Sequence, residues 1–153
     1  MREYIVPALF LLCAQASPAQ TAPEWSVLKD SKGLCQITVP PDWIPLADSK
    51  GAAVFRDSTT AIAVVTSQPG QGFKPLPASL QKVLDIRKEH VFENTAKRVF
   101  YQDRISKHAE HPNAYSVSVP GKDGTCSCHV TFLPSVPAET AKKIALSLRA
   151  ATQ

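Results

Sequence analysis

Three of the four cysteines are the residues whose type and spacing point most clearly to chemistry. Cys35 begins the alternating run Cys35-Gln36-Ile37-Thr38-Val39, and Cys126 and Cys128 lie in a second alternating run. Residues two apart on a strand share a face with about 6.6 Å between Cβ atoms, whereas a disulfide needs roughly 3.5–4.5 Å. We therefore predict that Cys35 pairs with Cys126 or with Cys128, and that the remaining thiol is buried and inert. The choice depends on a strand register that the sequence does not reveal.

The same thiols also have the chemistry of a metal site. Together with His129, the thiolates of Cys35, Cys126 and Cys128 are ligand types that suit zinc and copper. Alternation along a strand, however, places His129 on the opposite face from the two cysteines, and no Cys-x-x-Cys pair completes a ligand set. We predict a disulfide and no metal or other cofactor. A thiol- or metal-dependent function centred on Cys35, Cys126 and Cys128 is the alternative.

Patterns that would identify an enzyme are missing from the sequence. It has no Gly-x-Ser-x-Gly elbow, no glycine-rich phosphate loop and no His-Glu-x-x-His motif. Cys128 and His129 are neighbours in sequence, but alternation separates them, so they do not form a nucleophile and its base. His108 and His111 lie in a polar run that fits a solvated turn better than a metal site. We predict no catalytic activity.

The first residues have the three-part pattern of a bacterial signal peptide over residues 1–19. After a short head comes an apolar run over residues 5–14, well below the roughly 20 residues that span a bilayer. Small residues then mark cleavage after Ala16 or after Ala19. We predict export to the periplasm or the medium, where disulfides persist, and a mature domain of residues 20–153 without a transmembrane segment.

Runs of predicted strands alternate with predicted helices along the rest of the chain. A length of 153 residues with 44% hydrophobic and 20% charged side chains fits one globular domain. Period-two patterns predict strands over residues 35–39, 51–56, 60–67, 99–105, 115–119 and 126–132, the last two forming a hairpin. Apolar spacing of three and four predicts helices over residues 78–94 and 137–150. This order predicts an α+β fold: a largely antiparallel sheet of about six strands with a middle helix and a C-terminal helix packed on it.

A proline-to-tryptophan corner follows the first alternating strand, in the run Ile37-Thr38-Val39-Pro40-Pro41-Asp42-Trp43. This corner resembles the opening of PsbP-like domains, a superfamily that includes the extrinsic photosystem subunit PsbP and the Ran-binding Mog-type proteins. The resemblance implies a central antiparallel sheet between helices and an accessory or binding role without catalysis. It transfers no functional residue to this chain. Trp43 is expected to be a core aromatic that caps the sheet.

The chain is mildly basic, with a net charge of +4 and an isoelectric point near 8.9. Between residues 82 and 111, seven basic side chains stand against five acidic ones. This surface favours weak binding to an anionic partner such as a phospholipid surface or an acidic protein. It lacks the concentrated patch with interleaved aromatics that is typical of nucleic-acid binding. The sequence therefore predicts an exported, non-catalytic domain that binds another protein or an envelope component.

Overall fold

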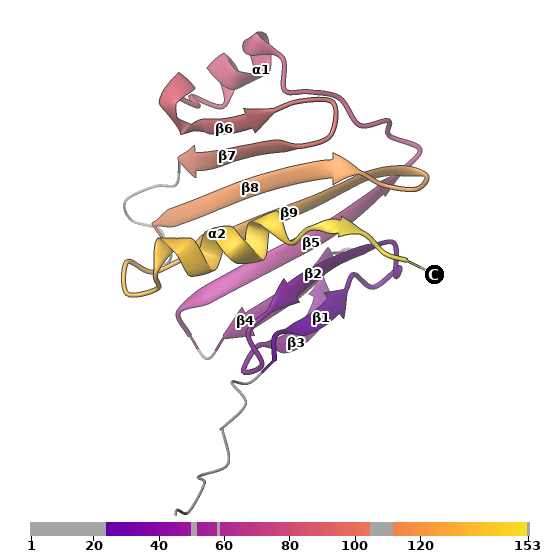
Figure 1. Ribbon diagram of the computed structural model, residues 1–153, viewed down its shortest axis with the longest axis vertical. Coiled ribbons are helices and arrows are strands. Elements are labelled where there is room, and N and C mark those ends of the chain that lie inside the picture. The colour runs from indigo at the N-terminus through magenta and orange to yellow at the C-terminus, as the bar shows by residue number, and fades with distance from the viewer. Residues whose placement is uncertain (1–23, 50–51, 58, 105–111, 153) are drawn as a thin grey trace, which may run out of the picture.

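The computed structural model describes residues 24–49, 52–57, 59–104 and 112–152. The predicted signal peptide, and the predicted turn with His108 and His111, lie outside this part of the chain. The described residues form ten strands in two sheets, two α-helices and one 3-10 turn (Figure 1). No helix in these residues is long and apolar enough to cross a membrane.

The larger sheet has seven strands in the order β3-β4-β5-β9-β8-β7-β6, and every neighbouring pair is antiparallel. Its strands are β3 (Ile44–Ser49), β4 (Ala52–Asp57), β5 (Ala61–Pro69), β6 (Val91–Asn94), β7 (Val99–Arg104), β8 (Asn113–Pro120) and β9 (Gly124–Phe132). The predicted hairpin is β8–β9, with Val119 opposite Cys126. The predicted α+β class with a mostly antiparallel sheet is confirmed.

A smaller sheet and a helix cover one face of the larger sheet. The smaller sheet has the order β1 (Ser26–Lys29), β2 (Cys35–Val39) and β10 (Arg149–Ala150). Figure 1 shows this sheet and helix α2 (Ala138–Leu146) on the same side of the larger sheet. Residues 68–80, which include the start of helix α1 (Ala78–Val83), lie over part of the opposite face at β7–β9, and we call that face the open face.

The core lies between the larger sheet and these covering elements. Along β9, Cys126, Cys128, Val130 and Phe132 are buried, and the residues between them are half-buried on the open face. Strands β5 and β8 alternate in the same way. Trp43, 6% exposed, belongs to the same core cluster. Each large side chain buried in this way contributes about 1.5–3 kcal/mol relative to an exposed one.

The helix predicted over residues 78–94 is wrong in its length. Helix α1 spans only Ala78–Val83, and a single 3-10 turn follows at Lys88–His90. Val91–Asn94 is not helical but is strand β6, which pairs with β7. The larger sheet therefore has one strand more at this edge than the sequence pattern indicates.

A reversal of the chain ends helix α1 early. Asp85 has a φ of 53°, its N–H donates to the carbonyl of Lys82 at 3.2 Å, and the N–H of Ile86 donates to the carbonyl of Gln81 at 2.9 Å. These two bonds are the Schellman pattern that closes a helix. Beyond it, the backbone of Val91–Asn94 finds partners on β7, and Ile86 is the sole buried residue between 78 and 90. Core burial therefore does not favour a longer helix.

The C-terminal helix, predicted over residues 137–150, is also shorter. Helix α2 ends at Leu146, and Arg149–Ala150 becomes strand β10 beside β2. The hydroxyl of Ser147 accepts a hydrogen bond from the N–H of Thr38 at 2.8 Å and so ties the end of the helix to β2. The chain leaves the helix because the free edge of β2 offers backbone partners for a short strand.

We predict that Gly124 on β9 does not tolerate a side chain. A Cβ atom there would lie 2.1 Å from the carbonyl oxygen of Gln68, because β5 and β9 approach closely at this end. Gly124→Ala should lower the free energy of unfolding by about 1–3 kcal/mol. Gly72→Ala, with nothing within 4 Å of its Cβ, is the matched control and should change it by less than about 1 kcal/mol. Equal denaturation midpoints for the two variants would contradict the close approach.

Candidate functional site

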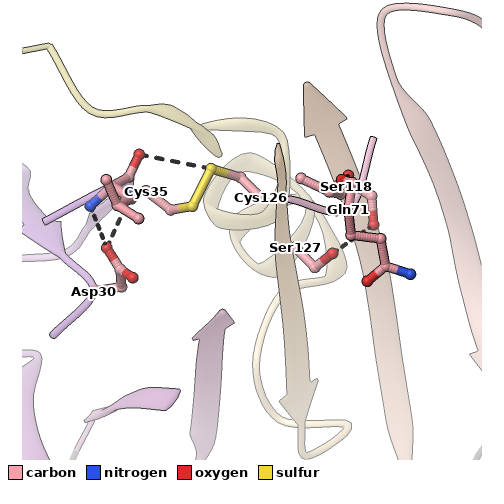
Figure 2. Close-up of a disulfide and its surroundings, with 8 residues drawn as sticks. Asp30, Cys35, Gln71, Ser118, Cys126 and Ser127 are labelled. Carbon is pink, nitrogen blue, oxygen red and sulfur yellow. Dashed lines mark hydrogen bonds between the residues drawn. A yellow bond between two sulfur atoms is a disulfide. The ribbon is translucent and has the colours of Figure 1, made fainter. Parts of the chain in front are cut away.

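A disulfide joins the smaller sheet to the larger one. The Sγ atoms of Cys35 on β2 and Cys126 on β9 are 2.06 Å apart, their Cα atoms are 5.7 Å apart, and 91 residues separate them in sequence. Both cysteines are almost completely buried. Figure 2 shows the bond on one side of β9, with Ser118 and Ser127 on the other. Of the two pairings that the sequence left open, the structure has Cys35 with Cys126.

The turn that leads into β2 is held by a buried carboxylate. Asp30 is 4% exposed, and its Oδ1 accepts hydrogen bonds from the N–H groups of Leu34 at 2.7 Å and Cys35 at 2.8 Å (Figure 2). The N–H of Asp30 donates to the carbonyl of Cys35 at 2.9 Å. These bonds fix the backbone at Cys35, so its side chain is already directed toward β9.

Cys128 is a free thiol in the core. It is 2% exposed and lies between Val65 of β5 and Val117 of β8 in the sheet register. Burial raises the pKa of its thiol to about 12, so the nucleophilic thiolate is not formed at neutral pH.

The alternative of a metal site at the three cysteines is not supported. Two of the three thiolates are consumed by the disulfide, and His129 lies on the other face of β9. Among the described residues, no three His, Cys, Asp or Glu side chains are grouped so that they could hold a metal ion.

The open face carries a polar network at the centre of β7, β8 and β9. The Ser116 hydroxyl donates to Asp103 Oδ2 at 3.1 Å and lies 2.8 Å from Nδ1 of His129. Because the hydroxyl proton goes to Asp103, His129 donates from Nδ1. Burial lowers the pKa of His129, and the Asp103 carboxylate raises it to a smaller extent. His129 is therefore neutral at pH 7.

This network has the residue types of a catalytic triad but not the geometry. In a triad, histidine takes the serine proton with one ring nitrogen and holds the carboxylate with the other. Here Nδ1 of His129 faces both Ser116 and Asp103, at 2.8 and 3.7 Å, and Ser116 donates to the carboxylate itself. The arrangement orients side chains across three strands and has no base aimed at a nucleophile. Sequence reasoning missed it because the three residues come from separate strands.

A groove of about 310 Å³ lies beside this network on the open face. Its floor is formed by Val99, Tyr101, Ser118, Thr125 and Ser127 of β7, β8 and β9. Residues 68–80, between β5 and α1, form its wall and contribute the side chains of Phe73, Leu76 and Leu80. The groove therefore offers hydroxyl groups along its floor and apolar surface along its wall.

Hydrogen bonds tie the wall of the groove to the sheet. The Asn94 side chain accepts from the N–H of Leu76 at 2.8 Å and donates to the carbonyl of Leu76 at 2.9 Å. At the other end, the Thr125 hydroxyl donates to the carbonyl of Gln71 at 2.8 Å. The wall is anchored at β6 and at β9, so the groove exists before any ligand binds.

Tyr101 is the polar aromatic of the groove floor. Burial raises the pKa of its phenol, the hydrogen bond with Ser116 lowers it, and the Asp103 carboxylate raises it, with burial the largest effect. The phenol therefore keeps its proton at neutral pH. Ser118 and Ser127 bond to each other at 2.9 Å and retain further acceptor capacity toward the groove. Alternation of Ser and Thr with buried residues on β8 and β9 was the sequence signal for this face.

Comparisons with known proteins identify the fold alone. No protein-family model and no curated protein matches the sequence. A crystal structure from Bacteroides thetaiotaomicron VPI-5482 is similar, with a TM-score of 0.52, 14% identity, and coverage of 85% of this chain and 49% of that one. The solution structure of cyanobacterial PsbP (CyanoP) from Synechocystis sp. PCC 6803 has a TM-score of 0.47, 12% identity, and coverage of 90% and 98%.

The second of these structures belongs to the family that the proline-to-tryptophan corner resembles. This chain spans about half the length of the Bacteroides structure. At such low identities the likeness is one of architecture, and it carries neither an activity nor a partner over to this chain.

We predict that the disulfide contributes about 4–5 kcal/mol to stability, because it closes a loop of some 91 residues in the unfolded chain. Cys35→Ser should lower the melting temperature by on the order of 15 °C, and so should reduction of the wild type. Cys128→Ala is the control, since it removes the free thiol and keeps the disulfide, and its melting temperature should still respond to reductant. A wild-type melting temperature that does not change on reduction would contradict the prediction.

We predict that His129 makes the domain less stable in acid. Its pKa is lowered in the folded state, so below about pH 6.5 the unfolded chain binds a proton that the folded chain resists. The stability from neutral His129 is therefore present above that pH and is lost as the pH falls. Between about pH 7.5 and about pH 5, the free energy of unfolding should drop more for the wild type than for His129→Gln. Identical drops would show that His129 is not the group responsible.

Proposed function

We propose that this protein is an exported, non-catalytic binding domain whose groove on the open face receives an extended segment of a partner protein in the cell envelope. The mature domain consists of residues 20–153 and acts in the periplasm or outside the cell. The observation that carries the proposal is the preformed groove between residues 68–80 and strands β7–β9.

The chemistry of the groove suits a peptide segment. Its volume of about 310 Å³ lies at the lower end of the range for ligand sites, enough for a few side chains. Hydroxyl groups of Ser118, Thr125 and Ser127 can bond to a peptide backbone, whereas Phe73 and Leu76 offer apolar contact to its side chains. A sugar or a small ion would leave the apolar wall unused, so a segment with both backbone polar groups and apolar side chains is the better fit.

Export and the lack of catalysis have their own support. The leader pattern over residues 1–19 and the Cys35–Cys126 disulfide both fit an oxidising compartment. The thiol of Cys128 is buried and protonated, and the His129 network has no nucleophile with a base. These features favour a domain that recognises a partner over one that transforms a substrate.

Site-specific photo-crosslinking in the producing cell tests the groove. A photoreactive amino acid at Leu76, in the wall, should yield a discrete adduct with an envelope protein. The same probe at Glu139, exposed on helix α2, is the control and should not. Ser127→Trp fills the floor and should reduce the Leu76 adduct at least about tenfold, the effect of losing a large part of an interface of this size. Equal adducts from Leu76 and Glu139, or adducts unaffected by Ser127→Trp, would contradict the proposal.

Mass spectrometry of the purified protein tests export separately. The N-terminus should follow Ala16 or Ala19, and Leu11→Arg within the apolar run should leave the full chain unprocessed in the cytoplasm. A mature protein that still begins at Met1 in the periplasm would contradict the cleavage sites.

A further inference from the structure

Helix α1 and the residue that follows it expose large apolar side chains. Leu80, Val83 and Leu84 are between 41% and 79% exposed, and they are three of the six exposed large hydrophobic residues among those described. Helix α1 buries none of its residues. Figure 1 places α1 beyond β6, projecting at one end of the larger sheet. These three residues lie within five positions of the chain, and exposed apolar residues grouped in this way mark an interaction site.

Basic side chains lie close to these apolar residues in the sequence, in a stretch that also holds Asp85 and Glu89. Residues 74–98 carry six basic and three acidic side chains, which accounts for +3 of the net charge of +4. Lys82 and Lys88 are exposed, and no described acidic group forms an ion pair with either. Arg87 is 3.9 Å from Glu89, and both side chains are at least 66% exposed, so this pair is weak. We call Lys82, Val83, Leu84, Arg87 and Lys88 the basic-apolar edge.

We propose that the basic-apolar edge docks the domain on an anionic phospholipid bilayer. Val83 and Leu84 enter the boundary between headgroups and acyl chains, and the three basic side chains lie among the lipid phosphates, as in interfacial protein segments. A bilayer suits this edge because Val83 and Leu84 are 79% and 42% exposed and helix α1 projects beyond β6 (Figure 1). A fluid headgroup layer closes around a projection, whereas a protein partner would need a matching pocket.

This inference extends the proposed function by naming the chemistry of a second envelope partner. It rests on that function only because export would bring the domain to a membrane surface. Binding to lipid is otherwise a property of the folded domain and does not involve the groove. The two proposals can therefore fail independently.

Cosedimentation of the mature domain with vesicles tests the charge. The domain should bind vesicles of phosphatidylethanolamine and phosphatidylglycerol, should release as salt is raised, and should not bind phosphatidylcholine. Replacing both Lys82 and Lys88 by Gln should weaken binding about 25-fold, or about fivefold for each charge. The matched control replaces Lys29 and Lys32, exposed near the β1–β2 turn, by Gln and should leave binding within about twofold.

The apolar contribution is tested with variants that cannot disturb the core. Val83→Ser with Leu84→Ser should weaken vesicle binding at least about tenfold without a change in melting temperature. Val27→Ser, at an exposed valine on β1, is the control and should bind as the wild type does. An environment-sensitive dye on Leu84→Cys should shift to the blue on anionic vesicles, and a dye on Val27→Cys should not. Cys128 is buried and does not take the label in the folded domain.

Three outcomes would overturn the proposal. The first is equal binding to phosphatidylcholine and to anionic vesicles, or no binding at millimolar lipid. The second is an equal loss of binding in the Lys82 and Lys29 double variants. The third is binding to polyglutamate but not to vesicles, abolished by Val83→Ser with Leu84→Ser, which would assign the edge to an acidic protein. Ser127→Trp should bind vesicles normally, so a failed lipid test leaves the groove proposal intact.

Discussion

The attachment of strand β2 to strand β9 is the constraint on which the rest of the structure depends. The smaller sheet has only three short strands, of which β10 has two residues, and its buried row needs the larger sheet as cover. Its buried row of Cys35, Ile37 and Val39 and the Cys35–Cys126 bond hold it against the larger sheet. The buried carboxylate of Asp30 fixes the turn that presents Cys35. Strand β2 packs on β5 and helix α2 packs on β8 and β9, so the two elements together cover the inner face of the larger sheet.

The smaller sheet and helix α2 cover one face of the larger sheet, so the groups available to a ligand lie on the open face. Because side chains alternate along β9, the same strand delivers Cys126 and Cys128 to the core and Ser127 and His129 to the open face. The reactive groups on the inner face are a disulfide and a protonated thiol. The groups described on the open face include hydroxyls, the Asp103 carboxylate, a neutral imidazole and a protonated phenol. Such groups form hydrogen bonds and do not act as nucleophiles without activation.

Period-two patterns predicted the parts of the fold that depend on one strand at a time. The β8–β9 hairpin and the shared face of Cys126 and Cys128 follow from alternation within a few residues. The choice of Cys126 as the partner of Cys35 depends on how β2 lies across β9, which is a contact between elements 91 residues apart. The groove was beyond prediction for the same reason, since Leu76 and Ser127 meet only in the folded sheet.

The overlong helix has a different cause. The spacing of Leu80, Val83 and Leu84 is that of an apolar helical face, and in most domains such a face is covered by the core. A hydrophobic pattern records which residues share a face and does not record what covers it. Here the Schellman bonds after α1 turn the chain away and the face remains exposed. The periodicity therefore described α1 correctly as amphipathic. Because the described part of the chain does not bury this apolar face, we infer that a partner outside this chain covers it.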